Sequence, residues 1–450
     1  MAASEYARFL QCLRLSSVTS TALATMAGKS KHPTQIRAFF SACATSPLEL
    51  PRMRTPTALV PRGSACIARL LVTRRQACTA GGSLRAFSTG GSHQAPPAAA
   101  APDFDIVQLQ RQADGGDAEA QYNLGLCFYT GHLVAPSDHA AAILFRLSAD
   151  RGHFAAMSYL GDCYAGGRGV DKNAALAFEW HLKSAQSSPR STYAQWRVGR
   201  CYADGAGVAR SDEQSLRWFI VAADNGHALA QFDAATALHH KGDPRSFAYS
   251  QKSAEQGVRE AQYNTGMCYL DGTFVAQDKK RAVAWFLKAA EQGSIEAQVA
   301  LSVAYRTGDG VAKDADRAFE FGKRAADQGD VGSMVQVAID LYHRNGPNDE
   351  QCTAYYRRAA DLGNADAQFY LGNRIMHGRG VAQNAALAVE YFGKAAAQGH
   401  AQAQHNLGAC YLNGQGVTKD LKLGTHWMEM ATRADPNYAR SDYSAPRTSQ

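Results

Sequence analysis

Residues 365–400 read ADAQFYLGNRIMHGRGVAQNAALAVEYFGKAAAQGH, and variants of this phrase recur along most of the chain. A glycine, alanine or serine marks the same point of each unit, at intervals of 36, 38, 36, 31, 36, 36, 34 and 36 residues. The nine marker positions are Gly125, Gly161, Gly199, Ala235, Gly266, Ser302, Ala338, Gly372 and Gly408. A sustained period of this length indicates a solenoid built from one repeated supersecondary unit. We therefore place nine repeats in residues 117–434.

Each unit predicts two helices joined by a loop. The first helix carries small residues at its centre, where a neighbouring helix must approach closely. The loop usually has the form Gly-x-Gly-Val, as in Gly378 to Val381, and a residue that favours helix N-caps follows three positions after the valine. These N-cap candidates are Ser137, Asn173, Ser211, Asp278, Asp314, Asn384 and Asp420. The second helix ends near a glycine such as Gly399, as helices often do.

A two-helix unit cannot bury its own apolar face, so each unit must pack on its neighbours. The sequence thus predicts an all-α solenoid. Residues 103–116 end like a second helix, and we expect them to form an N-terminal capping helix. Residues 435–450 contain two prolines and are expected to form a disordered tail.

Two units depart from the loop pattern. In unit four the loop is replaced by residues 239–244, where we expect Asp243 to be the N-cap and Pro244 the first helical residue. In unit seven it is replaced by Asn-Gly-Pro-Asn at residues 345–348. Irregular units are places where a partner could dock, and neutral drift of the loops is the alternative explanation.

The period, the Gly-x-Gly-Val loop and the closing phrase Lys-Ala-Ala, seen at residues 288–290 and 394–396, resemble the Sel-1-like repeat family of the tetratricopeptide-like superfamily. The resemblance covers about 70% of the chain. It implies a right-handed α-solenoid of antiparallel helix pairs whose first helices line an inner, concave surface. It also implies a function, because members of this family generally act as adaptors and scaffolds for other proteins.

Amide side chains recur on the first helices and are the candidate protein-binding residues of that concave groove. They are Gln121, Asn123, Gln195, Gln231, Gln262, Asn264, Gln298, Gln368, Gln404 and Asn406. Repeated amides of this kind could hydrogen-bond the backbone of an extended partner segment. The alternative is that glutamine belongs to the repeat consensus and bonds the end of an adjacent helix.

The first 87 residues have the composition of a targeting segment. They contain 12 Lys and Arg but only two acidic residues, and an amphipathic helical stripe begins at Tyr6. This combination is typical of a mitochondrial presequence, and Arg85-Ala86-Phe87-Ser88 resembles a processing-peptidase site that would be cut after Phe87. We assign residues 1–87 to a disordered presequence and 88–102 to a linker, with the mitochondrial matrix as the favoured location. A disordered cytosolic tail and a plastid address are the alternatives.

Without these 87 residues the remaining chain carries a net charge of −3. Organellar RNA binding by a helical-repeat protein is therefore the weaker alternative to protein binding, because phosphate backbones require clustered positive charge. We expect protein partners and no nucleic acid.

The sequence offers no catalytic, cofactor-binding or metal-binding constellation. Five cysteines occupy one repeat position, two residues after the marker: Cys127, Cys163, Cys201, Cys268 and Cys410. One cysteine per unit leaves neighbouring sulfurs too far apart for a bridge, so small buried thiols are expected. The family resemblance suggests hydrolase activity only for relatives with paired cysteines inside a unit, and such pairs are missing here. We therefore expect a non-catalytic protein without cofactor.

Overall fold

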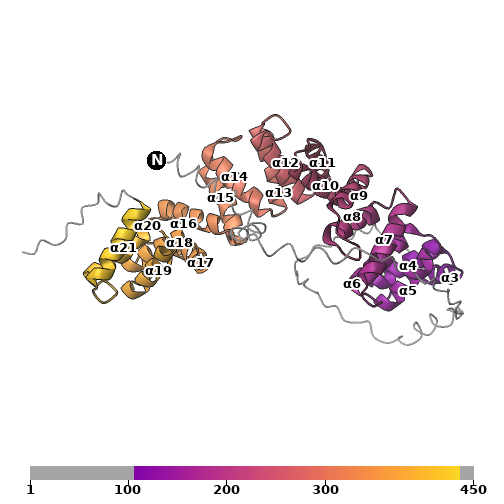
Figure 1. Cartoon of the computed structure of the whole chain (residues 1–450), viewed down its shortest axis with the longest axis horizontal. Helices are drawn as coiled ribbons and strands as arrows, with labels where there is room; N and C mark the ends of the chain where they lie inside the picture. Colours follow the sequence, from indigo (N-terminus) through magenta and orange to yellow (C-terminus); the bar gives the residue numbers. More distant parts are fainter. Residues whose placement is uncertain (1–105, 436–450) are drawn as a thin grey trace, which may run out of the picture. The chain divides into compact units, whose positions relative to one another are not determined.

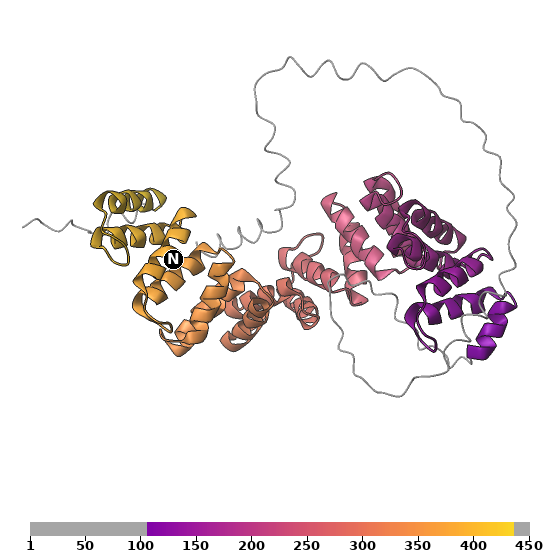
Figure 2. The ribbon, with the colours of Figure 1, turned by 90° about the horizontal axis from the view of Figure 1, so that it is seen from below.

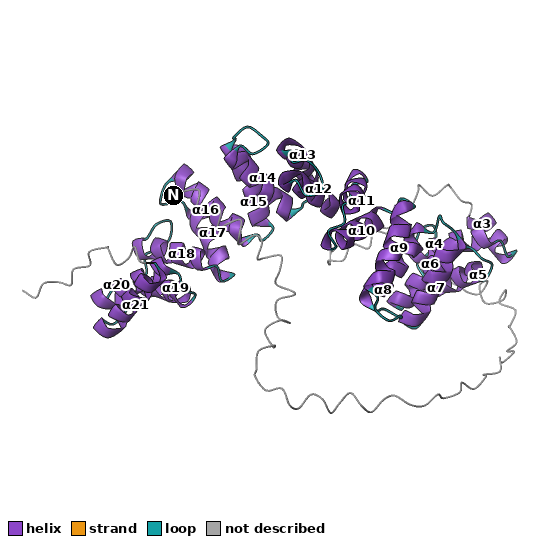
Figure 3. Cartoon of the chain, turned by 45° about the horizontal axis from the view of Figure 1, so that its top comes forward, coloured by secondary structure: helices purple, strands orange, loops and turns teal. Residues whose placement is uncertain are grey.

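The computed structural model describes residues 106–435, which form 19 α-helices and, within that range, no strand (Figures 1 and 3). The expected all-α repeat solenoid is confirmed. The predicted presequence and linker, and the tail beyond Asp435, lie outside the described residues.

The helices follow the predicted pairing. The helix α3 (Ile106–Asp114) lies within the segment expected to cap the array and packs on α4. The first helices of the nine units are α4 (Ala118–Thr130), α6 (Phe154–Gly166), α8 (Thr192–Asp204), α10 (Ala228–His240), α12 (Arg259–Asp271), α14 (Ile295–Thr307), α16 (Val331–Asn345), α18 (Ala365–His377) and α20 (Ala401–Asn413). The second helices are α5 (Asp138–Ala149), α7 (Ala174–Ser187), α9 (Asp212–Asp224), α11 (Arg245–Glu255), α13 (Lys279–Glu291), α15 (Ala315–Asp327), α17 (Glu350–Asp361), α19 (Ala385–Ala397) and α21 (Leu421–Ala434). Each helix makes its main contacts with the helices before and after it in the chain (Figure 2).

The second helices begin where the sequence predicts. All seven N-cap candidates stand directly before a helix, and each side chain accepts a hydrogen bond from a main-chain N–H in the first turn. Such a bond satisfies a donor that has no partner within the helix, and it contributes about 1 kcal/mol.

Unit four differs by one residue from the prediction. Helix α11 starts at Arg245, so Pro244 lies in the N-cap position instead of the first helical turn. Asp243 still accepts a hydrogen bond at 2.9 Å, from the main-chain N–H of Arg245. Pro244 has a φ of −63° and a ψ of −18°, which are helical values, so it lies at the boundary between the N-cap and the first helical residue.

Three histidines that follow the closing glycine of the preceding unit cap the first helices. Nδ1 of His153, His227 and His400 accepts a main-chain N–H three residues ahead, in each case at 3.1 Å. An Nδ1 that accepts must be unprotonated, so each of these bonds requires a neutral imidazole. Their recurrence after the closing glycine was visible in the sequence, but the capping bond was not predicted from it.

The marker glycines let the two helices of a unit approach closely. A Cβ at Gly125, Gly199, Gly266 or Gly372 would lie only 2.6–2.8 Å from a phenylalanine ring of the following helix. Unit six reverses the pair, since Ser302 is the larger partner and faces Gly322. The predicted close approach at small residues is thus confirmed. Glycine is required at those markers where the facing residue of the second helix is a phenylalanine.

The second glycine of each Gly-x-Gly-Val loop also has a steric reason. Gly169 has a φ of +71°, and a Cβ there would overlap the main-chain oxygen of Asp138 at the start of the preceding second helix. In units one and five this position is held by Leu133 and Phe274, which adopt φ values of +64° and +61°. Unit one follows α3, and unit five follows the unit with the shortened loop. Neither is therefore preceded by a unit with a regular Gly-x-Gly-Val loop.

All six cysteines in the described range are free and buried. The five in the repeat position therefore are the small buried thiols that the sequence predicts. Burial raises the pKa of the Cys163 thiol to about 12 and that of Cys410 to about 11, which keeps both protonated at neutral pH.

Candidate functional site: a buried glutamine ladder and a pocket at units seven and eight

The glutamines of the predicted groove are buried. All seven are between 2 and 5% exposed. In six of them Nε2 donates to the main-chain oxygen eight residues earlier, in the last turn of the preceding second helix, at 3.0–3.4 Å. Each of these oxygens also accepts the main-chain N–H of the glycine that follows its helix, so the glutamine adds a second bond at the end of the helix before it.

The same glutamines also bond to the helix that follows. Oε1 of Gln231, Gln262, Gln298 and Gln368 accepts Nε2 of a second glutamine near the end of the next second helix, at 2.7–2.9 Å. Gln195 makes the equivalent contact with Nδ2 of Asn225 at 3.0 Å. We call this set of contacts the glutamine ladder; it links three consecutive helices at four of the nine repeats.

The glutamine ladder ends where the array ends. Oε1 of Gln121 and of Gln404 is buried and finds no hydrogen-bond partner among the described residues. At these two units the next second helix does not end in a glutamine. In the structure the glutamines bond adjacent helix ends, as in the alternative that the sequence left open. Binding of a partner segment by these residues stays a prediction.

The three asparagines of the predicted groove are only half-buried. Asn406 donates to Oδ1 of Asn373 on the neighbouring first helix at 3.1 Å, and Asn123 donates to Glu119 of its own helix at 3.4 Å. Neither of these two contacts joins the predicted asparagines to each other. They remain accessible, unlike the glutamines.

One polar cluster lies between units two and three. His181 is fully buried, and its imidazole takes the place against Gly161 that phenylalanine holds in four other units. Asp162 accepts from the Tyr193 hydroxyl at 2.9 Å, and Nε of Arg197 and Nε2 of His181 lie 3.3 and 3.4 Å from it. Burial lowers the pKa of His181, so the imidazole is neutral. The cluster is accounted for by packing between the two units.

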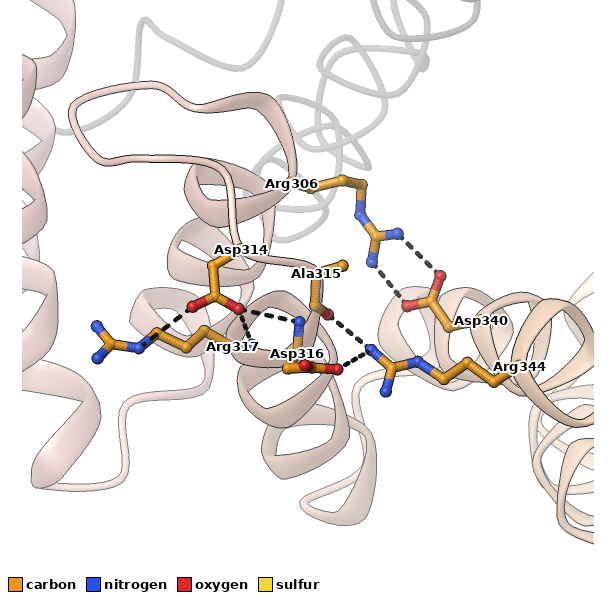
Figure 4. A network of polar contacts seen from close by, with 7 residues as sticks. All are labelled: Arg306, Asp314, Ala315, Asp316, Arg317, Asp340 and Arg344. Atoms are coloured by element: carbon orange, nitrogen blue, oxygen red, sulfur yellow. Dashed lines mark hydrogen bonds and ion pairs between the residues drawn. The ribbon is translucent and has the colours of Figure 1, made fainter.

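Arginine pairs hold units six and seven together (Figure 4). Arg306 on α14 donates to both carboxylate oxygens of Asp340 on α16, at 2.8 and 2.9 Å. Arg344 on α16 reaches the start of α15, where it donates to the main-chain oxygen of Ala315 and pairs with Asp316, both at 2.9 Å. Helix α16 thus pairs with one arginine and one aspartate of unit six, Arg306 and Asp316.

On its other side, α16 borders a pocket of about 410 Å³ shared with α17, α18 and the loop after α18. Three tyrosines contribute to its wall, Tyr342, Tyr356 and Tyr370, and the last two rings stack at 5.2 Å. Arg374 also lines the pocket although it is only 4% exposed. This pocket borders the irregular unit seven, whose altered loop marks it as a place where a partner could dock.

The Sel1 repeat model matches nine segments of the chain. They are residues 118–153, 154–188, 192–227, 228–258, 259–294, 295–330, 333–364, 365–400 and 401–436. The chain belongs to the Sel1 repeat family. The nine repeats predicted in 117–434 are thereby confirmed, including the two Sel1 units with irregular loops.

Solved Sel1 structures are similar to the chain. A protective antigen of uropathogenic Escherichia coli with an SLR fold is 31% identical, over 74% of this chain and 72% of that one, with a TM-score of 0.63. A Sel1 repeat protein from Oxalobacter formigenes is 30% identical over 73% of this chain and 87% of its own, with a TM-score of 0.37. No curated protein matches the chain significantly.

Sel1 repeat proteins generally act as protein-interaction scaffolds, and this coarse function applies to the present chain. Among residues 106–435, no helix has the length and apolar character needed to cross a membrane. The same stretch holds no group of three or more His, Cys, Asp or Glu side chains placed to bind a metal ion.

Sequence reasoning missed the functional interest of Arg374. It occupies the repeat position where five other Sel1 units carry a cysteine, two residues after the marker. The other three units carry Ala237, Ala304 and Asp340 there, so Arg374 is the one cation in the column, and the sequence alone contained this signal.

Proposed function

We propose that this Sel1 repeat protein is a mitochondrial scaffold that acts as an assembly factor or accessory subunit of a larger complex and binds segments of other proteins. The observation that carries the proposal is the nine-repeat array together with the arginine-rich, acid-poor leader. The array supports the scaffold role, because proteins of this family generally act as protein-interaction scaffolds. The leader supports the location, because import signals of mitochondria have this composition.

The proposed mitochondrial location is tested by determining whether residues 1–87 are removed from the protein in mitochondria. The full chain with a C-terminal tag is expressed in cells, the mitochondria are isolated, and the N-terminus of the protein is sequenced. We expect the mature chain to begin at Ser88, and the substitution Arg85→Ala to leave a longer form. An uncleaved chain found in the cytosol would contradict the proposed location.

The scaffold role is tested by cross-linking and affinity purification of the tagged protein from the same organelles. We expect one or a few proteins in near-stoichiometric amounts. Recovery of the free monomer alone would contradict a scaffold. Salt-sensitive retention of RNA would instead favour nucleic-acid binding, against which the net charge of −3 outside residues 1–87 argues.

A further inference from the structure

We propose that the pocket formed by α16, α17, α18 and the loop after α18 binds a carboxylate from an acidic segment of a protein partner. The proposal rests on the scaffold function above and specifies the chemistry of one contact. It is carried by an uncompensated buried cation, by a second arginine at the same pocket, and by a lining without acidic residues.

The buried cation is Arg374. Its guanidinium donates Nε–H to Oγ1 of Thr353 at 2.7 Å and another N–H to the main-chain oxygen of Asp349 at 2.6 Å. Both acceptors are neutral, and no ion pair joins Arg374 to any carboxylate in the described part of the chain within 4.0 Å. A buried cation that lacks an anionic partner is costly to keep. An incoming carboxylate would supply that partner with charge-assisted hydrogen bonds.

The second cation is Arg379 in the loop Gly378-Arg379-Gly380. The chain contains a matched loop, Gly167-Arg168-Gly169, in which the arginine is already satisfied. Arg168 pairs with Asp138 at 2.6 Å, and its guanidinium lies 3.7 Å from the centre of the Tyr129 ring. The side chain of Arg379 is exposed, lines the pocket, and pairs with no acidic residue between 106 and 435.

The rest of the lining favours an anion beside an apolar group. His343 and His377 add two potential N–H donors, and no aspartate or glutamate lines the pocket. The stacked rings of Tyr356 and Tyr370 offer apolar surface next to these donors. A peptide that places Asp or Glu beside an aromatic or aliphatic residue matches this arrangement, whereas a bare inorganic anion would leave the tyrosine surface unused. A side-chain carboxylate and a chain-terminal carboxylate share this chemistry.

The test uses the purified full chain and a display library of short random peptides, with side chains and free C-termini both presented. We expect selected peptides to carry Asp or Glu, or a free C-terminal carboxylate, next to an apolar residue. Replacing Glu by Gln, or amidating the C-terminus, then identifies which carboxylate is bound and should weaken binding about tenfold.

Matched variants assign the binding to the pocket. Arg379→Gln should weaken the selected peptide about tenfold, while the control Arg168→Gln should leave its affinity unchanged. Arg374→Gln should weaken it further, and circular dichroism melting of that variant separates loss of binding from loss of folding. Selection of peptides without acidic residues, equal affinity for Arg379→Gln and Arg168→Gln, or binding of inorganic phosphate with no peptide binding would each overturn the proposal. Any of these outcomes would leave the scaffold function to its own test in mitochondria.

Discussion

At Gly161 a histidine takes the place that phenylalanine occupies in four other units. His181 is fully buried, and neither of its ring nitrogens makes a hydrogen bond of good geometry within the described range. Such nitrogens lose their hydration on folding without full compensation. We expect His181→Phe to raise the free energy of unfolding by about 1 kcal/mol, measured by urea denaturation.

The reverse change provides the control for that prediction. Phe219→His places an imidazole against Gly199, where a ring atom lies 2.6 Å from the position of a glycine Cβ. It should lower the free energy of unfolding by about 2 kcal/mol, because it buries polar nitrogens in an apolar site. A loss of stability in His181→Phe would show instead that the contact with Asp162 outweighs the packing.

His227 makes the array sensitive to acid. Its Nδ1 must be unprotonated to cap α10, and burial lowers its pKa to about 4 from an ordinary value near 6.5. Between these pH values the unfolded chain binds one more proton than the folded chain, so stability is full above about pH 6.5 and falls as the pH drops toward 4. The expected loss is about 3 kcal/mol.

Urea denaturation between pH 8 and pH 4 measures this loss. His227→Asn keeps a good N-cap residue without a titrating group, so its stability should fall less steeply over the same pH range. Parallel pH profiles for the two proteins would refute the role of His227. The ring also stacks on Trp196 at 5.3 Å, so the variant is compared by slope and not by absolute stability.

At the scale of the helices, the glutamine ladder joins each unit to the next. Gln262 donates to the main-chain oxygen of Ala254 at 3.2 Å and accepts from Gln292 at 2.8 Å. Methionine stands at this repeat position in two units, as Met157 and Met334, so Gln262→Met preserves the volume. We expect it to lower the free energy of unfolding by about 1–2 kcal/mol, because the hydrogen bonds to Ala254 and from Gln292 are both lost.

A double-mutant cycle checks that assignment. Gln292→Ala alone should cost less, since Gln292 is exposed and water can replace its partners. Once Gln262 is methionine, Gln292→Ala should cost less than it does in the wild type, because only the bond of Gln292 to the main-chain oxygen of Gly257 remains to be lost. This difference measures the coupling. Additive losses would mean that the two glutamines stabilise the array independently.

The helices could be predicted from the sequence more completely than the side-chain contacts between helices. The period, the caps and the small residues at the marker positions are local signals, and each depends on the geometry of a single hairpin. The role of Gln262 could not be fixed in the same way. Its register on the helix was evident, but whether that register faces solvent or the preceding helix end depends on how units stack.

The same distinction between local signals and the stacking of units explains why the candidate pocket could be predicted only in part. The irregular loop of unit seven was visible, because Asn345 to Asn348 break the Gly-x-Gly-Val pattern. That Arg374 would be buried beside this loop, bonded only to neutral oxygens, required the packing of α17 against α18. Sequence spacing places a residue on a helix, but only tertiary contacts decide whether its charge has a partner of opposite sign.

For the molecule as a whole, contacts that run mainly between neighbouring helices predict that damage stays local. Gly169→Ala should disrupt the junction of units one and two, because its Cβ would overlap the main-chain oxygen of Asp138 and its φ is +71°. Gly152→Ala is the matched control, since its φ is +89° but nothing lies within 4 Å of the added Cβ. We expect a loss above about 2 kcal/mol for the first and about 1 kcal/mol for the second.

Hydrogen exchange read by mass spectrometry locates the damage. In a repeat array the stability of a unit depends on its own helices and its immediate neighbours. Gly169→Ala should therefore speed exchange in α5, α6 and α7 and leave α18 to α21 at the wild-type rate. Faster exchange along the entire array would mean that the nine units unfold as one cooperative body, and the pocket at α16 to α18 would then be sensitive to changes at the opposite end of the chain.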